Sequence, residues 1–343
     1  MELLSTEQGL DVLRGAVSAA QASHVGLLEA RALMSADLEW VGQAVDAAAS
    51  DGAAPGSKAA AHLAASGGKR VRALCVLLAC ACYGPVPPAA RELAAVAEMV
   101  HAATLLHDDV IDDGDERRGM PTARKVFGNA VSVLAGDLLL THALDRTARA
   151  APDALPDLLV TLRRLVDGEI IQLRGRTEID LSEATYHRIV SGKTASLFGW
   201  AARAGGRLGG APDAHLDGLA AFGEHLGVAF QLVDDTLDYD GDARLTGKTL
   251  LADLHEGKVT LPLALTCAST PSLAAEIARV RAGDAEAASR VAAAVRASGS
   301  CREVRRRAAV ATQAALAALS PAPRSPARAL LERVANDLTA RDA

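Results

Sequence analysis

Aromatic residues and excess positive charge are both lacking in this 343-residue sequence. Phe, Trp and Tyr make up 3% of the residues, and 36 Lys and Arg are outnumbered by 42 Asp and Glu, which gives a net charge of −6. A surface that binds nucleic acid normally combines a basic face with stacking rings. The composition therefore argues against a nucleic-acid partner. Half of the residues are hydrophobic, which is enough for a sizeable core and argues against disorder.

Signals for membranes and export are lacking too. The longest uncharged run, residues 73–90, contains Gly84 and three prolines, so its apolar part is too short to span a bilayer. The first residues show no basic leader followed by an apolar stretch. The five cysteines include no CxxC pair, and we interpret them as reduced core residues. We therefore expect a cytoplasmic protein without a transmembrane segment.

Strand patterns are nearly absent, since few runs alternate Val, Ile, Thr and aromatic residues. Segments of about 15–30 residues instead repeat apolar positions at i, i+3, i+4 and i+7, and short Gly and Pro clusters separate them. This pattern predicts an all-α fold, a compact bundle of long helices joined by short loops. Residues 212–239 are apolar around most of the helix and are expected in its middle. We expect one domain over 1–343, with the motifs in about 67–262 and a C-terminal helical extension over 263–343.

Two acid-rich segments share one spacing. They contain Asp108, Asp109 and Asp112 in DDVID, and Asp234, Asp235 and Asp238 in DDTLD. On a helix, the first and last aspartate of each segment lie on one face, one turn apart. Such carboxylates repel each other and suffer from the dipole at the C-terminal end of a helix, so two facing clusters require cations. Oxygen ligands without His or Cys favour Mg²⁺.

Basic residues recur beside glycines and beside the acidic segments. They are Lys69, Arg70 and Arg72 in GGKRVR, Arg117 and Arg118 in DERRG, Lys193 with Thr194 in SGKTAS, and Lys248 and Lys258 in TGKTLLADLHEGK. Backbone N–H groups at helix starts and guanidinium groups both suit phosphate. GGKRVR and SGKTAS are each expected to begin a helix after a turn. Together with the acidic clusters, these residues predict a cleft that binds a diphosphate with Mg²⁺.

With these motifs in order, together with FQLVDD and EGKVTLP, the sequence resembles the all-trans polyprenyl (isoprenyl) diphosphate synthases. The segment FGNAVSVLAGDLLLTHAL is more similar to the long-chain, octaprenyl-type branch. The resemblance implies a single large helical bundle of the isoprenoid synthase type around a deep central cavity. It also implies a Mg²⁺-dependent, head-to-tail condensation of isopentenyl diphosphate with an allylic diphosphate. It also implies about three Mg²⁺ ions per site and a homodimer, for which the Ala-rich residues 129–148 are the candidate interface.

The resemblance further implies roles for single residues. Direct Mg²⁺ ligands are expected to be Asp108, Asp112 and Asp234, supported by Asp109, Asp235 and Asp238. The allylic diphosphate is expected to be held by Arg117, Lys193 and Lys248, and isopentenyl diphosphate by Lys69, Arg72, His101 and Arg118. The reacting carbons are expected to lie beside Phe230 and Gln231, with Thr194 also binding substrate and with Asp253 and Lys258 on the polar rim. Leu251 and Ala252 depart from the family's pattern, in which a Gly precedes the aspartate, and we expect a stiffer loop around Lys248.

Product length depends on the helix that leads into the first acidic segment. Ala103 and Thr104 lie about one turn before Asp108, and Val100 continues their face. In the family, a bulky aromatic residue at these places stops chain growth early. As a helix, residues 88–108 would be about 30 Å long, so an unblocked tunnel along them would be deep. We therefore expect a product of roughly thirty to fifty carbons, suited to a quinone side chain. Close helix packing is the competing reason for small residues here.

Other functions remain open at this point. A farnesyl or geranylgeranyl diphosphate synthase makes a shorter product. A class I terpene cyclase shares the first acidic motif but normally has an Asn/Ser/Glu triad in place of the second. A di-iron bundle needs two Glu-x-x-His pairs, and Glu98 with His101 supplies one. A non-catalytic subunit of a heteromeric synthase usually loses an acidic motif or the basic residues, all of which are present here.

Overall fold

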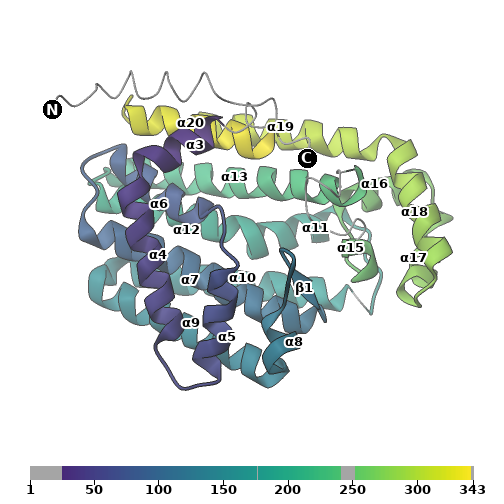
Figure 1. Ribbon diagram of the computed structural model, residues 1–343. Coiled ribbons are helices and arrows are strands. Elements are labelled where there is room, and N and C mark those ends of the chain that lie inside the picture. Colours follow the sequence, from purple (N-terminus) through teal and green to yellow (C-terminus); the bar gives the residue numbers. More distant parts are fainter. Residues whose placement is uncertain (1–24, 176, 241–251, 341–343) are drawn as a thin grey trace.

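Helices form nearly all of the structure (Figure 1). The computed structural model describes residues 25–175, 177–240 and 252–340. Within these ranges the strands are limited to β1 (Glu116–Arg117) and β2 (Met120–Pro121), which form one short antiparallel pair. The prediction of an all-α fold is therefore confirmed. None of the helices in these ranges combines the length and the apolar character that crossing a membrane requires.

The first part of the chain supplies the helix that carries the first acidic cluster. Its helices are α3 (Val25–Leu33), α4 (Ser35–Ser50), α5 (Gly56–Ala65), α6 (Val71–Ala81), α7 (Pro88–Ile111), α8 (Ala123–Phe127) and α9 (Asn129–Ala150). Proline is favoured at the first position of a helix because it needs no N–H partner there, and α7 begins at Pro88. Helix α7 packs along α9 and also contacts α4 and α6. Asp108 therefore lies at the end of a long helix that its neighbours hold on several sides.

The middle of the chain supplies the helix with the second acidic cluster. Its elements are the 3₁₀ turn η1 (Pro152–Ala154), α10 (Leu155–Arg174), α11 (Glu183–Val190), the π-helical turn η2 (Ser191–Ala195), α12 (Ser196–Leu208) and α13 (Asp213–Asp240). Helix α12 packs closely on two neighbours. A Cβ atom at Gly205 would lie 2.1 Å from the carbonyl oxygen of Val76 in α6, and one at Gly223 in α13 would lie 2.2 Å from that of Phe198 in α12. Glycine thus brings these backbones into contact.

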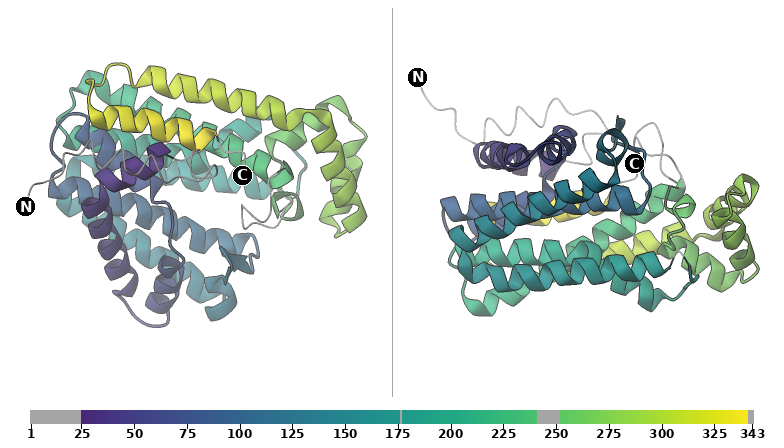
Figure 2. Two further views of the ribbon diagram at one scale, coloured as in Figure 1. Left: turned by 45° about the horizontal axis from the view of Figure 1, so that its top comes forward. Right: turned by 90° about the horizontal axis from the view of Figure 1, so that it is seen from below.

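The C-terminal region packs back onto the bundle. It consists of α15 (Ala252–His255), α16 (Leu261–Ser269), α17 (Leu273–Arg281), α18 (Ala285–Ser298), α19 (Ser300–Ala318) and α20 (Pro326–Thr339). Helix α19 runs along α13, which therefore lies between α12 and α19, and α20 contacts α3 and α6. Figures 1 and 2 show α17 and α18 at one end of the molecule. The extent of the domain, 1–343, stays a prediction.

Within the described residues, most of the buried apolar side chains belong to three clusters. The largest joins α4, α6, α7, α12 and α20. A second joins α16, α17 and α18 to Tyr239 of α13 and Leu254 of α15. The third joins α11, α13 and α19. All five cysteines are free thiols in buried positions, as the sequence predicts.

Candidate active site

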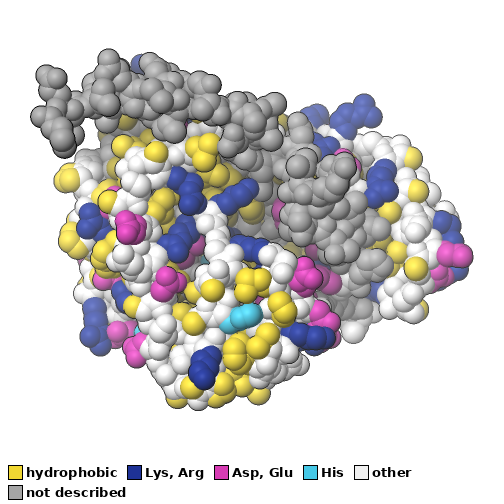
Figure 3. Space-filling view, viewed as in Figure 1, with side chains coloured by type: hydrophobic (Ala, Val, Ile, Leu, Met, Phe, Trp, Pro, Cys, Tyr) yellow, Lys and Arg dark blue, Asp and Glu magenta, His cyan; other side chains and the backbone are white. Residues whose placement is uncertain are grey.

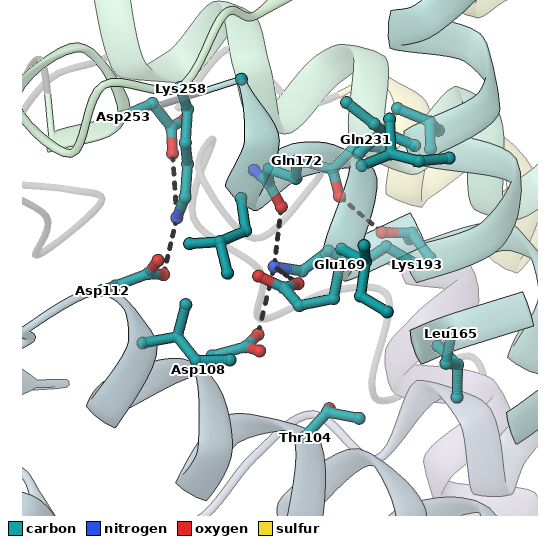
Figure 4. Close-up of a pocket in the computed structure, with 18 of the residues that line it drawn as sticks. Thr104, Asp108, Asp112, Leu165, Glu169, Gln172, Lys193, Gln231, Asp253 and Lys258 are labelled. Carbon is teal, nitrogen blue, oxygen red and sulfur yellow. Dashed lines mark hydrogen bonds and ion pairs between the residues drawn. The ribbon is translucent and has the colours of Figure 1, made fainter. Parts of the chain in front are cut away.

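A cavity of about 580 Å³ lies between α7, α10, η2 and α13, and residues 253–260 border it on a further side. Its lining includes Asp108 and Asp112 from α7 and Asp234 and Asp235 from α13. Figure 4 shows Asp108 joined to Lys193 and Asp112 joined to Lys258, with Thr104 and Leu165 outside these ion pairs. The two acidic clusters, far apart in the sequence, therefore share one cavity.

The end of α7 directs its aspartates to different sides. The backbone N–H of Asp112 donates to the carbonyl oxygen of Asp108 at 2.7 Å, which continues the helical turn through both residues. Asp108 and Asp112 line the cavity. Asp109 is buried and accepts hydrogen bonds from Arg117, at 3.0 Å from Nε and 2.7 Å from Nη2. Asp109 thus holds Arg117 at the edge of the cavity, which Arg117 also lines.

Lys193 of η2 reaches across the cavity to the first cluster. Its Nζ lies 3.4 Å from Asp108 Oδ2, forms an ion pair with Glu169 and donates to Gln172 Oε1 at 2.9 Å (Figure 4). Burial lowers the pKa of Lys193, but the charges of Asp108 and Glu169 outweigh burial and leave it raised. The ammonium group is therefore charged at neutral pH.

Burial also controls the charge of Asp108. It raises the pKa of this carboxyl to about 6, and the neighbouring carboxylates of Glu169 and Asp112 raise it as well, while Lys193 opposes them. A carboxylate that is costly to ionise gains most from a nearby cation. The site therefore favours the arrival of positive charge beside Asp108.

Lys258 forms a similar bridge on the other side of the cavity. Its Nζ donates to Asp112 Oδ2 at 2.8 Å, lies 3.8 Å from Asp253 Oδ1 and pairs with Glu256 (Figure 4). Burial lowers the pKa of Lys258, but Asp253, Asp112 and Glu256 together raise it above its ordinary value. Lys258 thus joins the end of α7 to the segment that follows α15.

The second cluster is fixed by hydrogen bonds from its own and a neighbouring helix. Tyr186 of α11 donates to Asp235 Oδ2 at 2.6 Å, and Gln231 Nε2 donates to Asp235 Oδ1 at 2.8 Å. Thr194 in turn donates to Gln231 Oε1 at 2.9 Å. Burial and the charge of Asp253 raise the pKa of Asp235 to about 8, although both hydrogen bonds act in the opposite direction. Asp238 is buried one turn further on and does not line the cavity.

Guanidinium groups surround His101, which also lines the cavity. Burial lowers the pKa of His101 well below its ordinary value, and the positive charges of Arg72, Arg117 and Arg118 lower it further. Arg72 is half-buried, with its guanidinium 4.7 Å from the ring centroid of Phe198. Figure 3 shows Lys and Arg side chains gathered on the face between α4 and β1. This side of the site suits an anion.

Two predicted basic residues, Lys69 and Arg118, do not line the cavity. Lys69 is exposed, and its carbonyl oxygen accepts a hydrogen bond from Arg31. A Cβ atom at Gly68 would lie 3.3 Å from Arg118 Nη1, so Arg118 lies over the glycine turn.

Arg70 turns away and donates to the carbonyl oxygen of Leu38 at 3.0 Å, so its inclusion among the phosphate-binding residues is wrong. The helix start predicted for GGKRVR is confirmed, because α6 begins at Val71.

The prediction that SGKTAS begins a helix after a turn is wrong. The π-helical turn η2 continues α11 directly into α12. Gly192 serves close packing here, because a Cβ atom on it would lie 2.6 Å from the carbonyl oxygen of Arg164 in α10. Isolated π-helical turns frequently occur at functional sites. In this case the turn presents Lys193 and Thr194 to the cavity.

The residues expected to control product length are divided by the structure. Thr104 lines the cavity about one helical turn before Asp108. Ala103 and Val100 are fully buried in the main core and do not line it, because they face the neighbouring helices. The packing explanation for small residues therefore accounts for Ala103.

Lys248 and Leu251, for which the sequence predicts a stiffer loop, lie outside the described residues.

Sequence reasoning missed several side chains of the site. Glu169 and Gln172 on α10 contact Lys193, Tyr186 on α11 contacts Asp235, and Glu256 contacts Lys258. Glu169 and Gln172 stand three residues apart, a spacing that places them on one helix face. That spacing was a usable signal, whereas nothing in the sequence pairs Tyr186 with α13.

The donor set fits Mg²⁺ in type and charge. Asp108, Asp112 and Asp234 offer carboxylate oxygens, without His or Cys, which is the set that Mg²⁺ prefers. Among the described residues, no group of three or more acidic, His or Cys side chains is already gathered as a metal site. Lysine ammonium groups instead neutralise Asp108 and Asp112. Mg²⁺ held by these carboxylates would take the place of the lysine contacts and supply positive charge there.

Comparison with known proteins agrees with this arrangement. Residues 56–298 match the sequence model of the polyprenyl synthetase family. The chain is 42% identical over 203 residues to the octaprenyl diphosphate synthase of Escherichia coli, a match that covers 59% of this chain and 63%, just under two thirds, of that enzyme. It is 38% identical to the all-trans-nonaprenyl-diphosphate synthase (geranyl-diphosphate specific) of Rhodobacter capsulatus, over 79% of this chain and 84% of that one.

Solved structures of similar proteins share the fold. The polyprenyl synthase from Caulobacter crescentus, solved with calcium and isoprenyl diphosphate, superposes with a TM-score of 0.87 at 35% identity and covers 92% of this chain and 98% of its own. A decaprenyl diphosphate synthase from Rhodobacter capsulatus gives a TM-score of 0.85 at 33% identity, with the same coverage. By sequence and by fold, the chain belongs to the polyprenyl synthetase family.

Proposed function

We propose that this chain is a Mg²⁺-dependent all-trans polyprenyl diphosphate synthase, a prenyltransferase that joins isopentenyl diphosphate to an allylic diphosphate. One observation carries the proposal: acidic clusters from α7 and α13 line the same cavity as two lysines and an apolar wall. The names of the relatives support it. The direct ligands are proposed to be Asp108, Asp112 and Asp234, while Asp109, Asp235 and Asp238 hold their surroundings in place.

The allylic diphosphate is proposed to bind at the charged end of the cavity. Lys193 and Lys258 are charged and already contact the carboxylates there, and Arg117 borders the same space. Bound Mg²⁺ supplies the positive charge that stabilises a diphosphate leaving group. Lys248 is proposed to join these cations, and Asp253 to position Lys258. This places the cations where negative charge develops, so they stabilise the transition state more than the bound substrate.

Isopentenyl diphosphate is proposed to bind on the guanidinium side. Arg72 and His101 line the cavity there. Lys69 and Arg118, which do not line it, are proposed to bind the same diphosphate. Guanidinium groups bind phosphate oxygens in a fork geometry. Because the pKa of His101 is lowered, this ring is neutral and donates a hydrogen bond without adding charge. The two diphosphates therefore approach from different sides.

The reaction follows from this placement. The allylic C–O bond breaks, its electron pair leaves with the diphosphate, and a delocalised carbocation remains. The double bond of isopentenyl diphosphate then forms a new C–C bond to that carbon, and the proton lost from the product passes to the diphosphate. Thr194, Phe230 and Gln231 line the cavity and are proposed to border the reacting carbons. Apolar walls exclude the water that would quench the cation.

We propose a medium or long product of roughly thirty to fifty carbons for this site, based on the length of the helix that leads to Asp108. Thr104 is a small residue in the lining of the cavity. The relatives named above are octaprenyl, nonaprenyl and decaprenyl diphosphate synthases. A farnesyl or geranylgeranyl product is the alternative, and mass spectrometry of extracted products distinguishes the two.

A homodimer is proposed from the exposed apolar side chains. More than half of the exposed large apolar residues in the described ranges lie on two helices, namely Val133 and Leu134 on α9 and Leu159, Val160, Val166, Ile170 and Leu173 on α10. Exposed apolar patches of this kind mark interaction sites. The interface predicted over 129–148 therefore extends to α10. Val166, Ile170 and Leu173 also line the cavity, so the same face covers the site.

The decisive test supplies purified protein with isopentenyl diphosphate, an allylic diphosphate and Mg²⁺. We expect elongated prenyl diphosphates, and no turnover with a chelator or in Asp108→Asn. A cyclised hydrocarbon formed from the allylic substrate alone would instead identify a terpene cyclase. Protein that stays inert until a second polypeptide is added would identify a subunit of a heteromeric synthase.

A further inference from the structure

The second half of the site is attached to the C-terminal helices, not only to the main bundle. Tyr239 follows the last aspartate of the DDTLD segment and is fully buried in the apolar cluster of α16, α17 and α18. Leu254, which follows Asp253, is buried in the same cluster. The Tyr239 hydroxyl lies 3.3 Å from Thr260 Oγ1, so this cluster also joins the end of α13 to the segment after Lys258.

Two arginines from this region hold the last turn of α13. Arg296 of α18 donates from Nε to the carbonyl oxygen of Tyr239 at 2.6 Å. Arg305 of α19 forms two hydrogen bonds to the carboxylate of Asp240, both at 2.8 Å. The last carbonyl groups of a helix lack partners within the helix, and cations there interact favourably with its dipole. These arginines therefore fix the turn that follows Asp235 and Asp238.

A third arginine holds the segment that carries Lys258. Arg281, the last residue of α17, donates from Nη2 to the carbonyl oxygen of Gly257 at 3.0 Å and to that of Gly175 at 2.6 Å. Gly175 directly follows α10, which carries Glu169 and Gln172. The N–H of Lys258 donates to the carbonyl oxygen of Asp253 at 2.8 Å, so the segment is a tight turn. Arg281 thus fixes this turn relative to α10.

We propose that Arg281, Arg296 and Arg305 are positioning residues, through which the C-terminal helices set the second acidic cluster and Lys258 in register with the first cluster. None of them lines the cavity, so each acts through the backbone or side chain that it holds. The test of this inference by enzyme kinetics rests on the proposed function, whereas the test by Mg²⁺ binding does not. Groups that orient metal ligands from outside typically change metal affinity or activity by about 10–100-fold when removed.

The experiment compares arginines of the same helices. Arg296→Met and Arg305→Met remove the contacts to α13, while Arg290→Met in α18 and Arg306→Met in α19 remove exposed ion pairs to Glu276 and Glu303. Calorimetry with Mg²⁺ and inorganic pyrophosphate measures metal binding without turnover. We expect the dissociation constant for Mg²⁺ to rise about tenfold in the first pair and to stay within about twofold in the second.

Kinetics extend the test to Lys258. Arg281→Met is expected to raise KM for the allylic diphosphate about tenfold. Arg296→Lys keeps a cation near Tyr239 and is expected to recover most of the Mg²⁺ affinity, which also covers the case in which Arg296→Met fails to fold. Equal Mg²⁺ affinity in test and control variants, at equal helix content by circular dichroism, would overturn the proposal. If the unmodified protein binds Mg²⁺ with pyrophosphate but makes no prenyl product, the proposed function fails and the calorimetric comparison still decides this inference.

Discussion

Two lysines and one tyrosine hold the carboxylates of the cavity. Lys193 and Lys258 neutralise Asp108 and Asp112, whereas Tyr186 fixes Asp235 by a short hydrogen bond. These contacts act on different clusters and differ in kind, because an ammonium group supplies charge and a hydroxyl supplies only orientation. Substitutions at the two kinds of contact therefore have distinguishable effects.

Tyr186→Phe tests the orienting contact. Removing the hydroxyl leaves Asp235 without one of its two hydrogen bonds, so we expect the Mg²⁺ concentration for half-maximal activity to rise about tenfold. The free energy of unfolding is expected to change by only about 1 kcal/mol. Tyr83→Phe is the control, since that hydroxyl contacts His215 and does not border the cavity. An identical Mg²⁺ dependence in the two variants contradicts the role given to Tyr186.

The raised pKa of Asp108 predicts how stability depends on pH without metal. The folded protein binds this proton more tightly than the unfolded chain does, so the stabilisation is complete below pH 4 and is lost as the pH rises through about 6. The difference amounts to at most about 3 kcal/mol. Urea unfolding in a chelator should therefore show unmodified protein losing stability relative to Asp108→Asn between pH 4 and 7. Parallel curves for the two proteins would refute the assignment.

At the scale of elements, α12 is positioned by glycines that contact backbone rather than side chains. Gly205 and Gly223 each leave no room for a Cβ atom, because a carbonyl oxygen of the neighbouring helix occupies that space. A carbonyl in a helix moves only with its helix. Close packing here sets how far α13, with the second acidic cluster, stands from α12 and η2.

Gly223→Ala is expected to lower the free energy of unfolding by about 3 kcal/mol, the upper end of the usual cost of overpacking. Gly56→Ala at the start of α5 is the matched control, because no atom lies within 4 Å of the added methyl group. That control should change stability by less than about 0.5 kcal/mol. Chemical denaturation measures both, and equal midpoints would show that α12 and α13 separate easily.

Thr104→Phe tests the product tunnel along α7. Since Thr104 lines the cavity about one turn before Asp108, a phenyl ring there is expected to shorten the main product, as mass spectrometry of the extract can show. Thr104→Val, which adds almost no volume, should leave the products unchanged. Ala103→Phe is expected to lower stability instead, because Ala103 is enclosed in the core. Products of normal length from folded Thr104→Phe protein would place the tunnel elsewhere.

For the whole molecule, the sequence predicted the all-α class and most of the Asp and Lys residues that line the cavity. The spacing of Asp108 and Asp112 was sufficient to predict that they lie together, because they stand one helical turn apart. Spacing was not sufficient for Tyr186 or Glu169, whose partners are set only when α11 meets α13 and α10 meets η2. Nor did it reveal that Ala103 faces the core, since the orientation of α7 depends on its neighbours.

The exposed apolar side chains on α9 and α10 predict the state of assembly. Leu134→Asp combined with Val160→Asp is expected to convert a dimer into a monomer in light scattering, because both side chains are exposed and neither lines the cavity. Val310→Asp on α19 places the same charge at an equally exposed valine elsewhere and should leave the dimer intact. A monomeric unmodified protein, or dimers in all three samples, would contradict the interface.

The ammonium groups of Lys193 and Lys258 act as internal counter-ions for Asp108 and Asp112. A divalent ion that takes either carboxylate releases an ammonium group, which is then available to a diphosphate oxygen. Metal loading and diphosphate capture are therefore thermodynamically linked, and each must increase the affinity for the other by the same factor. Neither Mg²⁺ alone nor diphosphate alone should then saturate the site at the concentrations at which the pair does.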